Sequence, residues 1–452
     1  MTSLSGPLAR RRAGVLLHVS SLPGGTLGEQ AFGFVDFLAD AGCTVWQVLP
    51  LVPPDDEGSP YRALSAMAGH PGLLDDHTRE RPAGRDYDEW REREADWLDP
   101  HVEYVTIRTT LGGRPWPGWP AALRDRDERR VSAAVGEAQE LADLVRHRQW
   151  WFARQWTALR TYAAEHGVLL FGDLPIFVAH DSADVWAHRH LFQLDAAGAP
   201  VTVTGVPPDY FAVDGQRWNN PHYDWDAMAA DGYGWWRRRI ARQRDLFDLV
   251  RIDHFRGFEA AWHVPVDAPT AKDGRWEPGP GLPLVERLVD TAGPGSLVAE
   301  DLGVITPAVE QLRRDAGLPG MKVLQFAFDG DPRNVHLPAH HEEGSVVYTG
   351  THDNDTTSGW WETLDADARA RVRDALLDHD EEMPWALVRL AMSSPSRLAV
   401  VPAQDLLGLG SEARMNTPGG AEGNWAWRAP AGSFTPALAA RVRSLVETTQ
   451  RH

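Results

Sequence analysis

Three acidic residues stand where short runs of β-forming residues end. Asp253, Glu300 and Asp353 each follow such a run directly or within a few residues. Chemistry at a glycosidic bond uses two carboxyl groups, one that attacks the sugar and one that carries a proton. A parallel barrel brings residues from the ends of several strands together at one mouth. The spacing therefore indicates glycosidic-bond chemistry at the mouth of a barrel.

Asp253 is the candidate nucleophile. Arg251 precedes it by two positions, and side chains two apart on a strand point to the same face. A guanidinium there would keep the carboxylate ionised and oriented. A purely structural ion pair at a strand end would show the same pattern, so this motif alone leaves both interpretations open.

Glu300 is the candidate general acid and base. The negative charge of Asp253 and an apolar wall would raise the pKa of Glu300 and keep it protonated. The adjacent Asp301 competes for this role. Successive strand residues face opposite ways, so only one of the two carboxylates should enter the barrel mouth. A pair of surface acids is the alternative.

Asp353 and the preceding His352 are candidates for a clamp on sugar hydroxyl groups. Such a clamp would hold the 2- and 3-hydroxyls and tighten as the ring flattens toward an oxocarbenium ion. A metal site is the alternative, but the acids and histidines around Asp353 lack a recognised ligand spacing. The clamp on sugar hydroxyl groups is therefore the favoured interpretation.

Further residues are candidates for holding a substrate. Asp173 ends another β-rich run, where a supporting role fits better than direct catalysis. Tyr210, Phe211 and Trp218 lie in one aromatic loop and could cover a sugar chain, with an ordinary surface loop of buried rings as the alternative. Tyr61, in a Ser-Pro-Tyr triplet, offers another stacking ring but is uninformative by itself.

Eight short β-rich runs divide the chain, and most read as strands buried on both faces. They are Val15–Val19, Val45–Leu49, Val168–Ile176, Leu249–Ile252, Ser296–Ala299, Lys322–Phe328, Val346–Thr349 and Leu398–Val401. Helical patterns cover Ala31–Ala41, Arg148–Glu165, a segment from Pro307 with Thr306 as N-cap, Ala366–Leu377, Ala386–Met392 and Thr435–Thr448. This α/β alternation predicts a (β/α)8 TIM barrel, with an open doubly wound sheet as the alternative.

Two segments are too long to be simple connections. Residues 53–145 are rich in Arg, Asp and Glu, and residues 181–236 hold many aromatic residues. We interpret both as insertions on the active-site face of a single catalytic domain that spans residues 1–452.

Composition disfavours several classes of protein. The 452 residues carry a net charge of -19, which argues against binding to nucleic acid or to an anionic membrane surface. No apolar run is long enough to span a membrane, and no signal peptide is evident. The single Cys43 allows no internal disulfide, which fits a cytoplasmic location. The sequence does not indicate an oligomeric state.

Taken together and in this order, the motifs resemble the amylomaltase family. Its members are 4-α-glucanotransferases, also called disproportionating enzymes, within the α-amylase superfamily. The resemblance runs from about Gly14 to Trp427, and its joint set of motifs is highly specific. The motifs are Leu16–His18, Ser21–Gly24, Trp46–Leu51, Ser59–Tyr61, Gly172–Ile176, His180–Trp186, Gly205–Phe211, Arg251–Phe258, Ala299–Thr306, Gly350–Asp355, Gln404–Pro418 and Gly423–Trp425.

The resemblance implies a (β/α)8 barrel that transfers part of an α-1,4-glucan or maltooligosaccharide by retaining double displacement. It implies a nucleophile in Asp253, an acid/base in Glu300 and a transition-state stabiliser in Asp353. It implies neither a metal nor an organic cofactor. It places the donor glucose against Arg251, His254, His352 and a stacking Tyr61, and the acceptor or chain against the loop of Tyr210, Phe211 and Trp218. Retention predicts that the two reacting carboxyl groups lie roughly 5–5.5 Å apart.

The chain departs from the family pattern outside the three acids. Gly25–Gly28 is shortened, Gly58 stands where the family has an acid, Asn219 replaces a usual glycine, and the first insertion is short. These differences bear on chain length and on the ratio of transfer to hydrolysis. A hydrolase of the same glucans and a non-catalytic glucan-binding protein are the alternatives. The intact acids weigh against the second.

Overall fold

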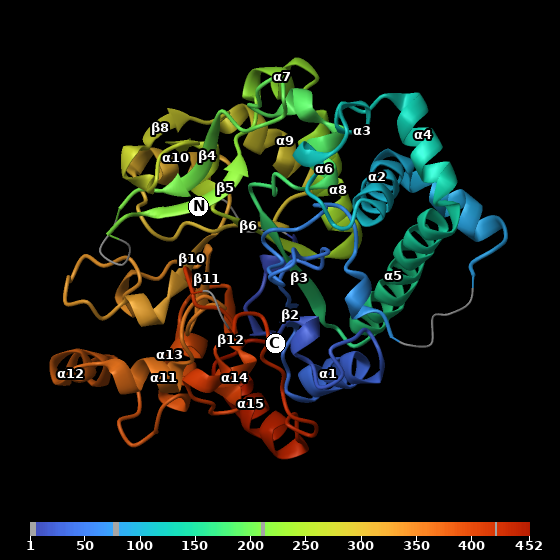
Figure 1. The fold of residues 1–452 in the computed structure, drawn as a ribbon. Helices are drawn as coiled ribbons and strands as arrows, with labels where there is room; N and C mark the ends of the chain where they lie inside the picture. The colour runs from blue at the N-terminus through green and yellow to red at the C-terminus, as the bar shows by residue number, and fades with distance from the viewer. Residues whose placement is uncertain (1–5, 76–80, 209–212, 421–422) are drawn as a thin grey trace.

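Eight parallel strands form one sheet at the centre of the molecule (Figure 1). The computed structural model describes residues 6–75, 81–208, 213–420 and 423–452. The strands are β1 (Arg12–Leu16), β2 (Val45–Gln47), β3 (Leu169–Pro175), β6 (Leu249–Asp253), β9 (Leu297–Ala299), β10 (Gly320–Val323), β11 (Ser345–Tyr348) and β12 (Leu398–Pro402). Each overlaps one of the eight predicted runs, which confirms the predicted strands.

The sheet closes on itself. Its order is β10-β11-β12-β1-β2-β3-β6-β9, so β9 and β10 are its two edges. The N–H of Ala299 donates to the carbonyl of Pro319 over 2.9 Å, and the N–H of Met321 donates to the Asp301 carboxylate over 2.7 Å. These bonds join the edges into a nearly closed (β/α)8 barrel, so the prediction of a barrel is confirmed and the open doubly wound alternative is wrong.

Alternating side chains of the strands fill the barrel. On β6, Leu249 belongs to the apolar cluster inside the barrel, whereas Val250 packs outward in the cluster that includes the helices. The period of two therefore puts Arg251 and Asp253 on the same inner face as Leu249. The same alternation turns Asp173 of β3 inward. Apolar packing deeper in the barrel thus supports charged side chains at its mouth.

Helices pack around the sheet (Figure 1). They are α1 (Glu29–Asp40), α5 (Gln139–Glu165), α8 (Gly234–Leu246), α9 (Leu282–Ala292), α10 (Pro307–Asp315), α12 (Ala366–Ala375), α13 (Trp385–Ser393) and α15 (Pro436–Thr448). All the predicted helices are present, and the N-cap of α10 is confirmed because the Thr306 hydroxyl accepts from the N–H of Val309. Helix α5 begins at Gln139 rather than Arg148, since Ala142 and Val145 in its first turns pack against α2.

The two long segments form further elements. Between β2 and β3 lie α2 (Arg85–Thr110), α3 (Ala121–Arg124) and α4 (Glu128–Glu137). After β3 come α6 (Ala183–Ala187), β4 (Thr202–Val206), β5 (Gln216–Pro221) and α7 (Trp225–Ala230). That residues 53–145 and 181–236 are insertions into a single domain stays a proposal, which these additional elements support.

A second, antiparallel sheet lies beside the barrel. Its order is β5-β4-β7-β8, in which β7 (Ala260–Pro265) and β8 (Arg275–Pro278) follow β6. None of these four strands was predicted, and β7 pairs with β4 from the distant second segment. Two short helices, α11 (Thr357–Thr363) and α14 (Ala403–Leu406), follow β11 and β12. Among the described helices, none is both long and apolar enough to cross a lipid bilayer.

Candidate active site

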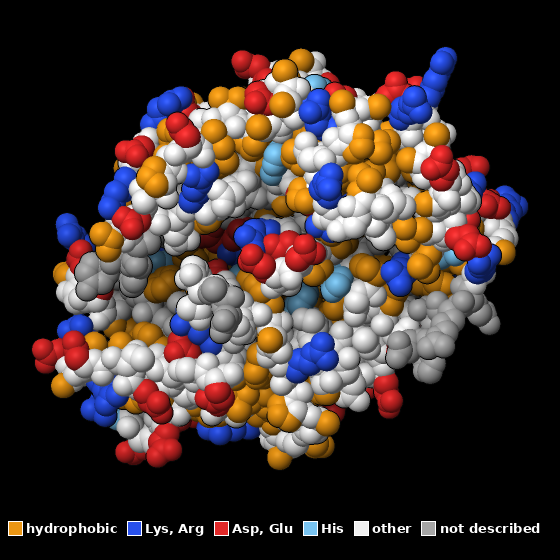
Figure 2. Space-filling model, viewed as in Figure 1, with side chains coloured by type: hydrophobic (Ala, Val, Ile, Leu, Met, Phe, Trp, Pro, Cys, Tyr) orange, Lys and Arg blue, Asp and Glu red, His pale blue; other side chains and the backbone are white. Residues whose placement is uncertain are grey.

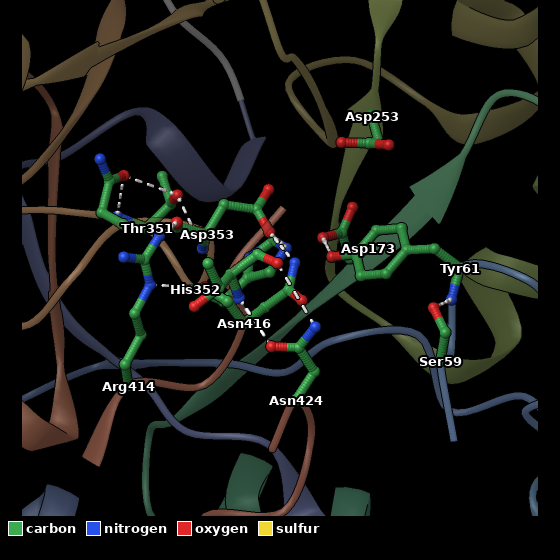
Figure 3. Close-up of polar contacts among 12 residues, drawn as sticks. Ser59, Tyr61, Asp173, Asp253, Thr351, His352, Asp353, Arg414, Asn416 and Asn424 are labelled. Carbon is green, nitrogen blue, oxygen red and sulfur yellow. Dashed lines mark hydrogen bonds and ion pairs between the residues drawn. The ribbon is translucent and has the colours of Figure 1, made fainter. Parts of the chain in front are cut away.

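The three acids lie where the C-terminal ends of the barrel strands meet. Asp253 is the last residue of β6, Glu300 follows β9 directly, and Asp353 lies in the turn after β11. In the close-up, Asp253, Asp353 and Asp173 gather around one space (Figure 3). The face drawn in Figure 2 is hollowed near its middle, with acidic and histidine side chains in the hollow.

A buried hydrogen-bonded network holds Asp253. The Tyr61 hydroxyl donates to Asp173 over 2.7 Å, and Nη1 of Arg251 donates to both oxygens of Asp173 over 2.8 and 2.7 Å. Nη2 of Arg251 pairs with Oδ1 of Asp253 at 2.8 Å. The side chains of Asp173 and Arg251 are 0% and 4% exposed, whereas Asp253 keeps 27% of its surface exposed. The network therefore fixes Asp253 from within the barrel and leaves its carboxylate open to a ligand.

The surroundings of Asp253 oppose its ionisation more than the sequence indicated. Burial raises the pKa of Asp253 to about 7, although Arg251 acts in the opposite direction. The charges of Asp173 and Asp353 raise this pKa further. The expected ion pair is thus present, but the guanidinium only partly offsets the cost of burying a third carboxylate in the same place.

Glu300 is a buried carboxyl group held beside Asp253. Its two oxygens accept from the N–H of His254 over 2.6 Å and from the N–H of Leu302 over 2.8 Å. Burial raises the pKa of Glu300 to about 8, with a further contribution from the charge of Asp253 and an opposing one from Arg251. The raised pKa favours the protonated form of Glu300, which a general acid requires.

The neighbouring Asp301 points to the opposite side, as strand alternation requires. Its carboxylate accepts from the N–H of Met321 and pairs with Nε of Arg313 at 3.1 Å. Asp301 therefore joins the two edges of the barrel, and Glu300 is the carboxyl that enters the mouth.

His254 connects the acids with the second sheet. Its backbone is left-handed, with φ of 52°, which aims its N–H at Glu300. Its ring meets Trp218 edge to face, with 4.7 Å between the ring centroids. Burial lowers the pKa of His254 to about 3, so the ring is neutral. Its Nε2 is buried without a hydrogen-bond partner among the described residues and is available to a sugar hydroxyl.

His352 and Tyr61 line the other side of the site. Nε2 of His352 lies 3.3 Å from Oδ1 of Asp353, and burial lowers the pKa of His352. The Tyr61 ring stacks on His352 at 5.2 Å between centroids, with 11° between the ring planes. One face of the Tyr61 ring is therefore occupied by the protein, and its hydroxyl is tied to Asp173.

Trp218 lies in a bulge of strand β5 and not in a loop, so the prediction of a loop at this residue was wrong. The pairing of β4 with β5 shifts register around it, and the following Asn219 has a left-handed φ of 66°. The usual glycine at that position has a physical reason, since glycine adopts positive φ without strain and asparagine tolerates it. The predicted contacts of Tyr210 and Phe211 fall outside the described residues.

No group of three or more His, Cys, Asp or Glu side chains among the described residues is arranged to hold a metal ion. The histidines near the acids instead contact aromatic rings and carboxylates, as His254 and His352 do.

Sequence reasoning gave no role to Asn416, which lies in the segment after β12. Its Nδ2 donates to Oδ1 of Asp353 over 2.6 Å. The signal that could have identified Asn416 was its position after the last strand of the barrel. Chain that leaves the last strand of a barrel starts at the same mouth as the catalytic turns, so polar side chains there are candidates.

Comparisons with known proteins agree with this geometry. The family model described as 4-alpha-glucanotransferase matches residues 17–79 and 75–433. The chain is 46% identical to the 4-alpha-glucanotransferase of Thermus thermophilus, over 98% of this chain and 99% of that protein. It is 43% identical to the chloroplastic/amyloplastic 4-alpha-glucanotransferase DPE1 of Arabidopsis thaliana, over 94% of this chain and 82% of that protein.

Solved structures give the same assignment. The amylomaltase from Streptococcus agalactiae in complex with acarbose matches with a TM-score of 0.94 and 31% identity, over 98% of this chain and 100% of that chain. The Thermus alignment extends over 495 residues, more than the 452 of this chain, so that relative has segments with no counterpart here. The chain therefore belongs to the 4-alpha-glucanotransferase family and is an enzyme of that kind.

Proposed function

We propose that this enzyme transfers segments of α-1,4-glucans by retaining double displacement, with Asp253 as the nucleophile. The Asp253 carboxylate attacks the anomeric carbon of the donor while Glu300 gives its proton to the departing glycosidic oxygen. The bond from the anomeric carbon to that oxygen breaks, and an ester bond to Asp253 forms. The released sugar leaves with the proton, and Glu300 is left as a carboxylate.

The second step reverses the roles. Glu300 takes the proton from the 4-hydroxyl of an acceptor sugar, whose oxygen attacks the anomeric carbon and displaces Asp253. The starting protonation states are restored, and two inversions retain the α configuration. Water competes with the acceptor, so the site must bind sugar in place of solvent.

One observation carries this proposal. Glu300 is bonded to the N–H of His254, the residue that directly follows Asp253. The acid/base and the nucleophile are therefore held by one backbone junction. The ion pair of Arg251 with Asp253 favours ionisation of Asp253, which leaves the proton on Glu300.

Asp353 and His352 complete the proposed donor site. Asp353 is 43% exposed and lies beside the buried His352. We assign both to the hydroxyl groups of the donor glucose, where a carboxylate also stabilises positive charge that develops on the ring. The Streptococcus agalactiae relative was solved in complex with acarbose, which supports a saccharide ligand for this chain. A cytoplasmic location stays a prediction.

Incubation with maltotriose tests the proposal. Glucose plus a ladder of longer chains at a constant number of reducing ends is expected from the enzyme. Asp253→Ala should abolish the ladder while the fold is kept, and Asp99→Ala, on the exposed surface of α2, should leave it unchanged. Substantial transfer by Asp253→Ala would remove Asp253 as the nucleophile. Rising reducing ends without longer chains would make the protein chiefly a hydrolase.

A further inference from the structure

Arg414 forms hydrogen bonds to the turn that carries Asp353. Its Nη2 donates to the main-chain carbonyl of Asp353 over 2.6 Å, and its Nε donates to the carbonyl of Asn416 over 2.7 Å. Asn416 in turn donates from Nδ2 to the carboxylate of Asp353 over 2.6 Å. Figure 3 shows Arg414 and Asn416 beside Asp353. The main chain and the side chain of Asp353 are therefore fixed by one closed ring of hydrogen bonds.

The turn needs this support because Asp353 is only partly enclosed. Its side chain is 43% exposed and contacts the polar groups of Asn416 and His352. The far end of the turn is anchored separately. The buried Asp405 accepts from the hydroxyls of Thr349 and Thr357 over 2.6 and 2.7 Å. Between these anchors, the N–H of Asp353 donates to the Thr351 hydroxyl within the turn, and Arg414 binds the Asp353 carbonyl from outside the turn.

An arginine suits this position for a geometric reason. The guanidinium carries several N–H donors in a fixed plane, so one side chain can hold two carbonyl groups in a defined relation. A lysine ammonium keeps the charge but lacks the rigid fork. These hydrogen bonds therefore depend on the shape of the arginine side chain and not on its charge alone.

We propose that Arg414 is a positioning residue that acts through Asp353. It holds the Asp353 carboxylate where positive charge develops on the donor sugar. This inference rests on the role proposed for Asp353. An interaction realised in the transition state affects kcat, whereas ground-state binding affects KM. Loss of the Arg414 hydrogen bonds should therefore lower kcat and leave KM for maltotriose nearly unchanged.

Two substitutions of Arg414 and a matched control test whether its hydrogen bonds position Asp353. Arg414→Met should lower kcat by about 10- to 100-fold, the range that misplacement of a reacting group by about 1 Å can cause. Arg414→Lys should recover little of the loss. Arg369→Met removes a similar pair of hydrogen bonds, in which Nε and Nη2 donate to the carbonyls of Trp361 and Glu362, and should leave kcat unchanged. A rise in KM at constant kcat would overturn the proposal.

Acarbose affinity separates this inference from the proposed function. Arg414→Met should weaken acarbose binding, measured by calorimetry, and should cause no further loss when combined with Asp353→Asn. An equal loss in both backgrounds would show that Arg414 acts independently of Asp353, with the role of Asp353 intact. Full activity of Asp353→Asn would instead remove the role proposed for Asp353. Circular dichroism of each variant excludes loss of the fold as the cause.

Discussion

Single residues set the order in which the two reacting carboxyl groups lose their protons. Burial raises both pKa values, to about 7 for Asp253 and about 8 for Glu300. Arg251 lowers both pKa values, and because it forms an ion pair with Asp253 it favours the ionisation of Asp253 first. The groups interact, so a pH profile reports the apparent values of the pair. The active form, with Asp253 ionised and Glu300 protonated, lies between them.

Removal of the Arg251 guanidinium should make Asp253 harder to ionise. In Arg251→Gln, Asp253 loses its cation and faces an unpaired Asp173, so the pKa of Asp253 should rise. The acidic limb of kcat/KM should therefore move to higher pH, in addition to a loss of rate. Arg251→Lys keeps a positive charge and should move the limb less. An acidic limb that stays in place in Arg251→Gln would assign it to a different group.

The elements that position the acids were predictable because their signals are local. The runs that end near Asp253, Glu300 and Asp353 are strands, and period-two alternation correctly predicted that only one of Glu300 and Asp301 enters the mouth. Such patterns need only neighbouring residues. The barrel closure also follows, since eight strands alternating with helices leave few other arrangements.

Contacts between distant parts of the chain could not be predicted from the sequence in the same way. Strands β7 and β8 owe their place to β4, which lies in a different part of the chain. The early start of α5 depends on packing against α2. Arg414 and Asn416 reach Asp353 from beyond the last strand, and no local pattern marks that contact. These features depend on partners that only the folded chain brings together.

The bulged strand β5 should influence the competition between sugar and water. Its Trp218 covers the edge of His254, whose N–H binds Glu300. Trp218→Ala opens that side to solvent and should shift products from transfer toward hydrolysis, seen as rising reducing ends from maltotriose. Trp276→Ala, on the opposite edge strand of the same sheet, is the control. Unchanged partitioning in Trp218→Ala would remove this role.

The backbone of the bulge gives a separate prediction about stability. Asn219 is exposed and holds a left-handed φ of 66°. Asn219→Ala should lower the free energy of unfolding by about 1 kcal/mol, the cost of that conformation for an ordinary residue. Asn219→Gly should cost less, because glycine adopts the conformation freely. Chemical denaturation measures both, and equal losses would show that the side-chain bond from Arg217 to Asn219 matters more.

At the scale of the whole molecule, the buried ionisable groups that catalysis requires lower the stability of the fold. Glu300 is buried with a pKa of about 8, against an ordinary value of 4.5. Between these two pH values the folded protein holds a proton that the unfolded chain has released. Folding then becomes less favourable as pH rises, because the folded state binds more protons than the unfolded state. The apolar core inside and around the barrel offsets this cost.

Glu300→Gln should remove that pH dependence. The glutamine has no proton to lose, so relative to the parent enzyme the variant should gain stability steadily between about pH 4.5 and about pH 8. Loss of one acceptor for the N–H groups of His254 and Leu302 adds an offset that does not change with pH. Denaturant titrations across this window give the difference at each pH. A constant difference would mean that Glu300 ionises alike in the folded and unfolded chains. It would then lack the raised pKa that its role as general acid requires, whatever the activity of the variant.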